Sequence, residues 1–348
     1  MRLNKIIGIG ITILLAIFVS CKKDSNHIND DIKEPIFYYV GYSFSGHYNE
    51  RDRKAILVVQ DSIVNLSPNR SADAKVVYAQ VVYAQGKDVF VAGNEHYEEE
   101  KNRVVYWKNG VKEYLSSAVK DNSATAIYAD NENIYVAGTI YQNKLPYQRL
   151  WINGGRKVNS GALAYSGIRA ITVYEGAYYL AGQFAQAASI WHGKTMYTIN
   201  NAPSEATYIH VENGEVLTMG YGNVDRNTDA AKVWKGSDEI FSYPVGARVS
   251  NILATMNGND YYFVTNSMSE DGINVARAYK NTQLLYELNT GAHSVKAMAI
   301  YIFNDKVYVL GNLLNAGKSV PTLWIDGVPK TLFTEQDNIY LNHMYIIL

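Results

Sequence analysis

The residues that could carry out chemistry do not form a recognisable catalytic pattern in this sequence. The seven histidines lack the spacing of metal ligands, and the HExxH, GxSxG, P-loop and EF-hand patterns are missing. The acidic segments HYEEE (residues 96–100) and DRNTD (residues 225–229) could hold a cation, but charged loops are usually just solvated. We therefore predict no catalytic residue, no metal and no cofactor.

The one cysteine, Cys21, stands where a specific modification would act on it. It follows a basic segment, MRLNK, and the apolar stretch IIGIGITILLAIFV, which is too short to span a bilayer and is typical of a secretory signal. The residues FVSC at 18–21 resemble the lipobox of bacterial lipoproteins, in which the cysteine is acylated and becomes the new N-terminus. We expect residues 1–21 to be a lipoprotein signal peptide with lipidated Cys21. An ordinary signal peptide with an incidental cysteine and a short anchor helix are the alternatives.

Composition and charge bound what the rest of the chain can do. Acyl chains on Cys21 would suffice for stable anchoring, so we expect an outer-membrane lipoprotein, periplasmic or surface-exposed. Residues 22–35 are almost wholly polar and predict a flexible tether. A net charge of −1 gives no electrostatic argument for a nucleic-acid partner. A hydrophobic content of 47%, with 29 tyrosines against 9 phenylalanines, favours a sheet-rich globular domain.

Beyond the tether the sequence repeats with a period of about 45 residues. A glycine recurs in segments such as FVAG, YVAG and YVLG, and one copy has Thr265 in its place. These glycines are Gly41, Gly93, Gly138, Gly182, Gly220 and Gly311. The second recurring position holds every tryptophan of the chain: Trp107, Trp151, Trp191, Trp234 and Trp324, with Tyr279 and Val59 in the two remaining copies. We count seven copies over residues 36–348.

Each copy resembles four short strands with two-residue alternation, such as ATAIYAD, NIYVAGT, QRLWIN and RKVNS. Seven four-stranded units of this length predict an all-β fold, a seven-bladed β-propeller with four-stranded antiparallel blades. The first copy lacks its first strand, and the final segment, NIYLNHMYIIL, is a strand left over. We expect this C-terminal strand to complete the first blade and close the ring, which would remove the exposed sheet edges.

The recurring glycines and tryptophans are interpreted as packing residues. A small Ala-Gly pair would let backbones approach closely, and the tryptophan would fill the space between neighbouring blades. The tryptophan precedes an Asn-Gly or Asp-Gly pair in WKNG, WING and WIDG, which suits a tight hairpin turn.

The loops between the second and third strand of each copy are long and dissimilar, whereas the other hairpin turns are short. Variable loops on a rigid scaffold are common places for binding, so the face that carries them is the candidate site. Its aromatic and imidazole side chains could stack on sugar rings or anchor a peptide, or could merely cap the blades. The predicted ligand-binding residues are Tyr42, His47, Tyr48, His96, Tyr97, Tyr141, Tyr147 and Tyr221.

The segments YVAG and YWKNG or LWING resemble the repeats of Gram-negative outer-membrane lipoproteins of unknown function. This resemblance covers residues 36–348 and implies a secreted, surface-held propeller. We predict a membrane-anchored extracytoplasmic binding or scaffolding module, monomeric as a domain, that recognises a glycan or a protein partner. The alternatives are a structural subunit of a surface complex and a glycan lyase or hydrolase, which would need paired carboxylates at the channel mouth. The acidic residues available to such an enzyme are Glu95, Glu98, Glu99, Glu100, Asp225 and Glu270.

Overall fold

The computed structural model contains β-strands from Ile36 to Ile347. It describes residues 34–45, 52–68, 74, 76–97, 101–117, 119–120, 122–142, 145–159, 167–193, 195–201, 203–225, 228–289, 293–315 and 318–348. The predicted signal peptide with Cys21, and residues 22–33 of the predicted tether, lie outside the described residues. Within the described part, no helix has the length and apolar character needed to cross a membrane.

The described chain is almost entirely β-strand, and five of its sheets have four strands each. In chain order the strands of these five sheets are β9 Ser123–Ala129, β10 Ile134–Gln142, β11 Leu145–Ile152 and β12 Gly155–Asn159; β13 Gly167–Tyr174, β14 Ala177–Phe184, β15 Ala187–His192 and β16 Thr195–Thr198; β17 Ser204–Glu212, β18 Glu215–Asp225, β19 Thr228–Lys235 and β20 Asp238–Gly246; β21 Val249–Asn257, β22 Asp260–Met268, β23 Asn274–Lys280 and β24 Gln283–Glu287; and β25 Ser294–Phe303, β26 Lys306–Asn315, β27 Lys318–Ile325 and β28 Val328–Thr331.

The other strands belong to a single nine-stranded sheet. They are β1 Ile36–Phe44, β2 Arg53–Val59, β3 Ser62–Asn65, β4 Val76–Gln85, β5 Asp88–His96, β6 Lys101–Lys108, β7 Val111–Tyr114, β8 Val119–Lys120 and β29 Ile339–Ile347. A short 3₁₀ helix, η2 (Glu335–Asp337), precedes β29. The C-terminal strand β29 runs antiparallel to β1, with Ile36 opposite Ile347 and Ser43 opposite Ile339.

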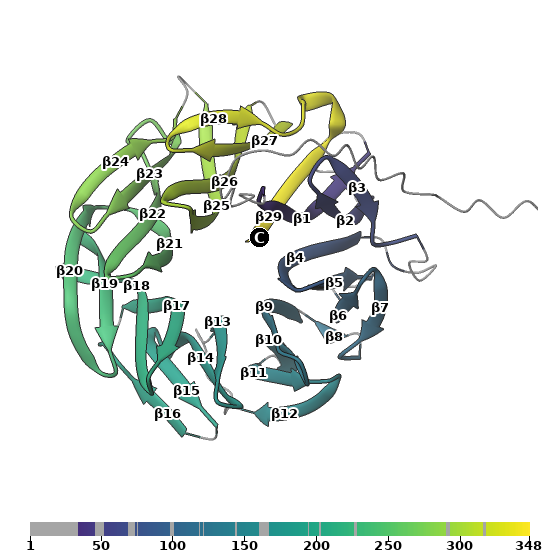
Figure 1. Ribbon diagram of the computed structural model, residues 1–348, viewed down its shortest axis with the longest axis horizontal. Helices are drawn as coiled ribbons and strands as arrows, with labels where there is room; N and C mark the ends of the chain where they lie inside the picture. Colours follow the sequence, from purple (N-terminus) through teal and green to yellow (C-terminus); the bar gives the residue numbers. More distant parts are fainter. Residues whose placement is uncertain are drawn as a thin grey trace, which may run out of the picture. The chain divides into compact units, whose positions relative to one another are not determined.

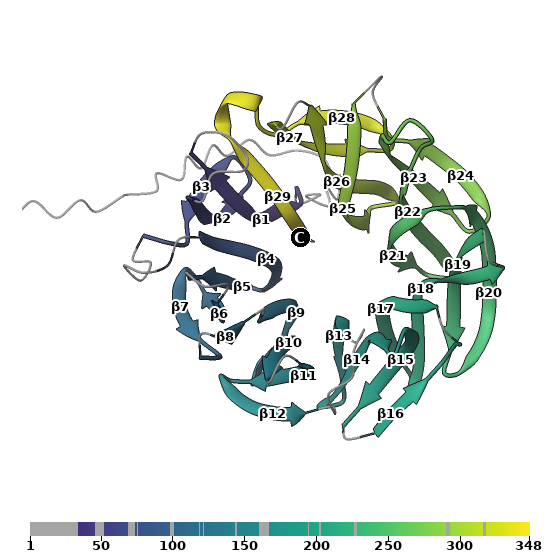
Figure 2. The ribbon, with the colours of Figure 1, turned by 180° about the vertical axis from the view of Figure 1, so that it is seen from behind.

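The sheets succeed one another around a central axis, as a β-propeller requires (Figures 1 and 2). The prediction of an all-β propeller is confirmed. The described strands do not form the predicted seven separate four-stranded sheets, however. Only five sheets have four strands, because β2 and β4 share one parallel bridge, Arg53 to Val76. That bridge joins two groups of strands, β29-β1-β2-β3 and β4-β5-β6-β7, into the nine-stranded sheet, whose ninth strand, β8, pairs with β6.

The recurring glycine lies opposite a β-bulge in the inner strand, the strand of each sheet nearest the axis. Gly93 on β5 pairs with Ala79 of β4 and the next pair is Ala92 with Val81, so Gln80 is the extra residue. A methyl group on Gly93 would lie 1.9 Å from the carbonyl oxygen of Tyr78. A methyl group would clash in the same way, 1.9–2.1 Å from a backbone oxygen, at Gly41, Gly138, Gly182 and Gly220. The close approach predicted for the glycine therefore lies within a sheet, between its first two strands.

The copy that lacks the glycine supports this explanation. Thr265 on β22 pairs directly with Ile252 of β21, and the bulge falls two residues further along, between Val249 and Asn251. A side chain is thus tolerated at this position when the inner strand does not bulge toward it.

Four tryptophans fill the space between neighbouring sheets, as predicted, and Trp107 fills the space between the two strand groups of the nine-stranded sheet. All five are at most 3% exposed. Trp151 of β11 packs with Phe90 and Ala92 of β5, and Trp324 of β27 packs with Tyr262 and Val264 of β22. Burial of a side chain this large contributes several kcal/mol to stability.

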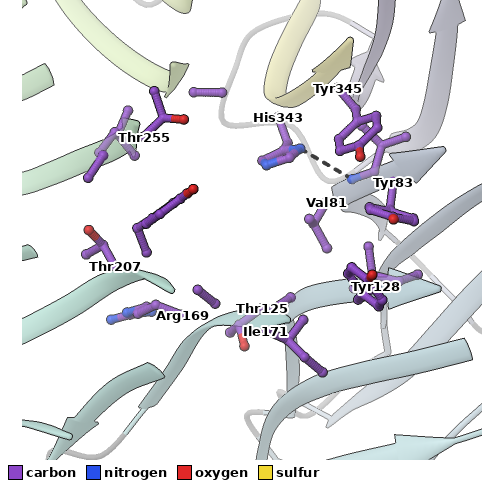
Figure 3. Close-up of a pocket in the computed structure, with 18 of the residues that line it drawn as sticks. Val81, Tyr83, Thr125, Tyr128, Arg169, Ile171, Thr207, Thr255, His343 and Tyr345 are labelled. Carbon is purple, nitrogen blue, oxygen red and sulfur yellow. Dashed lines mark hydrogen bonds between the residues drawn. The ribbon is translucent and has the colours of Figure 1, made fainter. Parts of the chain in front are cut away.

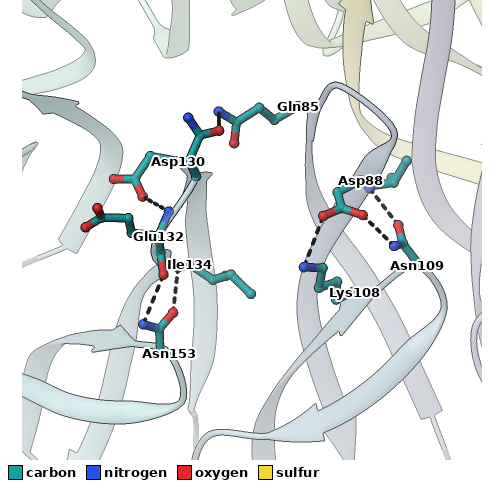
Figure 4. A network of polar contacts seen from close by, with 10 residues as sticks. Gln85, Asp88, Lys108, Asn109, Asp130, Glu132, Ile134 and Asn153 are labelled. Carbon is teal, nitrogen blue, oxygen red and sulfur yellow. Dashed lines mark hydrogen bonds and ion pairs between the residues drawn. The ribbon is translucent and has the colours of Figure 1, made fainter.

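The polar residue of the recurring turn has a specific structural role (Figure 4). In four copies its side-chain Oδ1 accepts a hydrogen bond of 2.9 Å from a backbone amide at the first or second residue of the second strand. These pairs are Val89 to Asn109, Ile134 to Asn153, Tyr261 to Asn281 and Val307 to Asp326. Asn109 and Gly110 both have positive φ, 50° and 80°, as an Asn-Gly hairpin turn requires. The side chain therefore links two consecutive hairpins of one sheet.

Candidate functional site

The strand register defines two opposite ends of the propeller. At one end, which we call the long-loop face, the second strand of each sheet ends and the third begins, as at His96 and Lys101. The inner strands start at this end, since Val76 of β4 pairs with His96. Ile36 lies at the opposite end, because it pairs with Ile347, where β29 finishes.

A cluster of aromatic side chains lies at the long-loop face. It comprises Tyr42, Phe44, Tyr78, His96 and Tyr340, and we call it the aromatic cluster. Tyr42 stacks on Tyr340, with ring centroids 5.4 Å apart and planes 11° apart, and meets Tyr78 edge-on at 5.0 Å. His96 meets Tyr78 edge-on at 4.8 Å. Such offset and edge-to-face arrangements are the favourable ones for aromatic rings.

Arg53 adds a positive charge to the aromatic cluster. Its guanidinium carbon lies 4.9 Å from the ring centre of Tyr42 and 5.3 Å from that of Tyr78. Its Nη1 also donates a 2.7 Å hydrogen bond to the Tyr78 hydroxyl. Tyr42 is only 4% exposed, whereas Arg53, Tyr78 and His96 are half-buried. The buried ring therefore supports the site, and the half-buried groups form the accessible part, suited to stacking and cation–π contact.

Tyr97 belongs to a different arrangement on β5, β6 and β7. Its hydroxyl donates a 2.7 Å hydrogen bond to Oε2 of Glu95, and Lys112 binds the other oxygen of that fully buried carboxylate. The Arg103 guanidinium lies 5.3 Å from the Tyr97 ring and 4.5 Å from the Tyr114 ring. Burial acts to lower the pKa of Lys112, but the hydrogen bonds that Lys112 makes with Glu95 and Tyr114 outweigh it and raise that pKa. Glu95, an acidic residue that an enzyme could use, is thus bound within an ion pair.

The remaining predicted residues are spread over other sheets. The amide of Tyr141 donates a hydrogen bond to Oδ1 of Asn122, and Tyr147 packs against the hydrophobic cluster that contains Trp151. Tyr221 lies beside Glu205, and burial together with that carboxylate raises the pKa of Tyr221 to about 12. Of the eight predicted residues, the structure brings Tyr42 and His96 into one cluster. His47 and Tyr48 lie outside the described residues.

Sequence reasoning missed Tyr78, Tyr340 and Arg53. Tyr78 and Tyr340 occupy equivalent positions in two copies of the repeat. Each comes directly before the inner-strand residue that pairs with the recurring glycine of its copy. Aligning the copies on that glycine would have brought the two tyrosines together, and the first residue of β2, Arg53, has no comparable signal.

The sequence-based predictions also did not include a central cavity of about 640 Å³ (Figure 3). Seven strands contribute to its wall: β4, β9, β13, β17, β21, β25 and β29. None of the residues that the structure shows lining it is Asp or Glu. The described residues also hold no group of three His, Cys, Asp or Glu side chains placed to bind a metal ion.

Comparison with known proteins gives similarity in fold. The β-propeller domain of the trilobed protease from Pyrococcus furiosus matches with a TM-score of 0.51 and 12% identity, over 87% of this chain and 95% of that one. The Trypanosoma rangeli sialidase in complex with the inhibitor DANA matches with a TM-score of 0.46 and 10% identity, over 86% and 53% of the two chains. The dihydro-heme d1 dehydrogenase NirN matches with a TM-score of 0.47 and 9% identity, over 88% and 68%.

At these identities the similarity shows the propeller fold alone, and the two matches with TM-scores below 0.5 carry no argument about this chain. No protein-family model matches the sequence. No curated protein matches it either.

Proposed function

We propose that the protein is a membrane-anchored binding or scaffolding module that recognises a glycan or a protein partner outside the cytoplasm. The observation that carries this proposal is the aromatic cluster with Arg53 at the long-loop face. Half-buried tyrosine, histidine and arginine side chains are the residue types that provide stacking platforms and binding hot spots. Glu95 is held by Lys112 and Tyr97, which favours a binding module over a hydrolase that would use this carboxylate.

We also infer that the propeller has seven blades and that β29 closes the ring as the inner strand of the first. The support is threefold. The nine-stranded sheet divides into two groups joined by one bridge. Gly41 faces a bulge at Asn342 of β29, as Gly93 faces one at Gln80. Seven strands, β29 among them, line the central cavity.

The anchoring proposal rests on Cys21 at the end of the apolar leader. The tether would join the propeller at Ile36, at the end opposite the long-loop face. We propose an outer-membrane lipoprotein with a monomeric propeller domain. Labelling with radioactive palmitate would be expected in the wild type and lost in Cys21→Ser, and equal labelling of both would contradict acylation at this residue.

The binding proposal is tested by screening the full chain, purified in detergent, on glycan and peptide arrays. Arg53→Met removes the charge and keeps most of the aliphatic stem, and His96→Ala removes the imidazole. Tyr197→Ala is the matched control, because Tyr197 is 53% exposed on β16, at the outer edge of its sheet. Selective binding that Arg53→Met and His96→Ala weaken at least about tenfold, and Tyr197→Ala leaves unchanged, would support the proposal. Absence of selective binding, or equal binding by all variants, would refute it.

A further inference from the structure

The central cavity has the properties of a small-molecule site, and its lining residues are not those of the aromatic cluster. Its volume of about 640 Å³ is of the size that small-molecule sites usually have. Its wall comes from strands that lie far apart in the sequence, so it depends on the assembled ring rather than on any one sheet.

The backbone of the wall offers donors and acceptors. β9, β13, β17, β21, β25 and β29 are each the terminal strand of their sheet, so one edge of each has no neighbour among the described strands. Unpaired edge amides and carbonyls need polar partners. On β4, the remaining strand of the wall, side chains of β29 supply two such partners: Nδ2 of Asn342 donates to the carbonyl of Ala79 at 2.8 Å, and the amide of Val82 donates a long, 3.5 Å hydrogen bond to Nδ1 of His343 (Figure 3).

Most polar side chains of the wall are uncharged amides and hydroxyls, and its arginine and histidines have partners. Nε2 of His210 lies 3.9 Å from Oε2 of Glu212. The bulge residues Gln80, Thr125, Thr207 and Asn342 line the cavity, and Oγ1 of Thr207 is buried with no hydrogen-bond partner among the described residues. The one arginine of the wall, Arg169, donates from Nε to Oε1 of Glu205 at 2.6 Å.

The histidine His343 is neutral at pH 7, because burial lowers its pKa to about 4. Since its Nδ1 accepts from Val82, its proton is on Nε2, which is therefore a donor.

Tyrosine rings line the wall together with aliphatic side chains such as Val81, Ile171 and Leu253. Tyr83 lies 4.8 Å from Tyr345 and 4.9 Å from Tyr128 between ring centroids, and Tyr301 meets Tyr345 edge-on at 5.5 Å. All four line the cavity and lie on four different inner strands. Figure 3 shows Tyr83, Tyr128 and Tyr345 grouped on one side of the cavity.

We propose that this cavity binds a neutral, polyhydroxylated small molecule of the size of a mono- or disaccharide. An anion would need a cation that is not already paired, and Arg169 is paired with Glu205. A cation would need a carboxylate, which the described wall lacks. Neutral hydroxyl, amide and imidazole groups beside tyrosine rings are suited to the hydroxyl groups and apolar faces of a sugar.

The test measures binding of maltose, cellobiose, trehalose and diacetylchitobiose to the full chain in a detergent without a sugar headgroup. Saturation-transfer NMR finds the ligand, and calorimetry gives its Kd. Thr207→Val and Tyr345→Phe each remove one hydroxyl from the wall and change its shape little. Loss of one neutral hydrogen bond should raise Kd about three- to tenfold in each. Tyr197→Phe, outside the cavity, should leave Kd unchanged, and Arg53→Met reports whether a sugar is bound at the long-loop face instead.

Saturable binding with this pattern would support the cavity as the site. Absence of saturable binding by all four sugars would overturn the proposal, and so would binding that Thr207→Val and Tyr345→Phe leave unchanged. Binding weakened by Arg53→Met alone would also overturn it, because the sugar would then be bound at the long-loop face.

Discussion

Substitution of one recurring glycine tests why the repeat exists. In the sheet of β13 to β16, a methyl group on Gly182 would lie 1.9 Å from the carbonyl oxygen of Gly167. Real Cβ atoms essentially never approach a backbone atom closer than 3.0 Å, so β13 and β14 must move apart in Gly182→Ala. The displacement costs about 1–3 kcal/mol of overpacking strain, and weakens one or two strand hydrogen bonds worth about 1 kcal/mol each. We expect the free energy of unfolding to fall by about 2–5 kcal/mol.

The matched control is Gly167→Ala on the facing strand. A methyl group there would meet nothing closer than 3.8 Å, and Gly167 does not have a positive φ. Its effect should be within about 1 kcal/mol and stabilising, because alanine restricts the unfolded chain. Urea unfolding followed by the fluorescence of the buried tryptophans measures both variants. Equal stability of Gly182→Ala and Gly167→Ala would refute the bulge explanation of the repeat.

Three further predictions follow from the same structure. Trp234→Ala removes a fully buried side chain between sheets and should lower the free energy of unfolding by about 3–5 kcal/mol, whereas a loss below about 1 kcal/mol would contradict its packing role. Glu95→Gln leaves Lys112 without its charged partner and should cost about 3 kcal/mol in urea unfolding; a Glu95→Gln/Lys112→Met double variant should be more stable than the single one, and an additive loss would argue against the pair. The folded-state pKa of His343, about 4 against an ordinary 6.5, means that the unfolded chain binds the proton first as pH falls. Stability should therefore decrease between pH 6.5 and 4 by an amount that His343→Gln reduces, and identical pH profiles of the two proteins would contradict this.

Much of the fold could be predicted from the sequence, because the period of about 45 residues and the two-residue alternation are visible in it. The glycine and tryptophan positions marked the strands correctly. The count of separate sheets could not be predicted, since it depends on a single bridge between Arg53 and Val76 that has no sequence pattern. The reason for the glycine was also hidden, because a bulge is a property of two paired strands rather than of one.

The candidate site was harder to predict for a physical reason. Tyr42 and Tyr78 lie on β1 and β4 near the start of the propeller, whereas Tyr340 lies on the C-terminal strand β29. Only the pairing of these strands brings the three rings together. Tyr97 was chosen for its residue type and lies instead in the ion-pair arrangement around Glu95. The central cavity arises from seven inner strands at once, so no single segment contains a signal for it.

The most direct test of the proposed function is hydrogen–deuterium exchange of the full chain with and without a ligand selected on the arrays. If the long-loop face binds it, backbone amides near Phe44, Arg53, Val76 and His96 should exchange more slowly in the complex, at the ends of β1, β2, β4 and β5 that meet there. The outer strand β16 should be unchanged. Slower exchange confined to outer strands, or to the end that contains Ile36 and Ile347, would contradict the account.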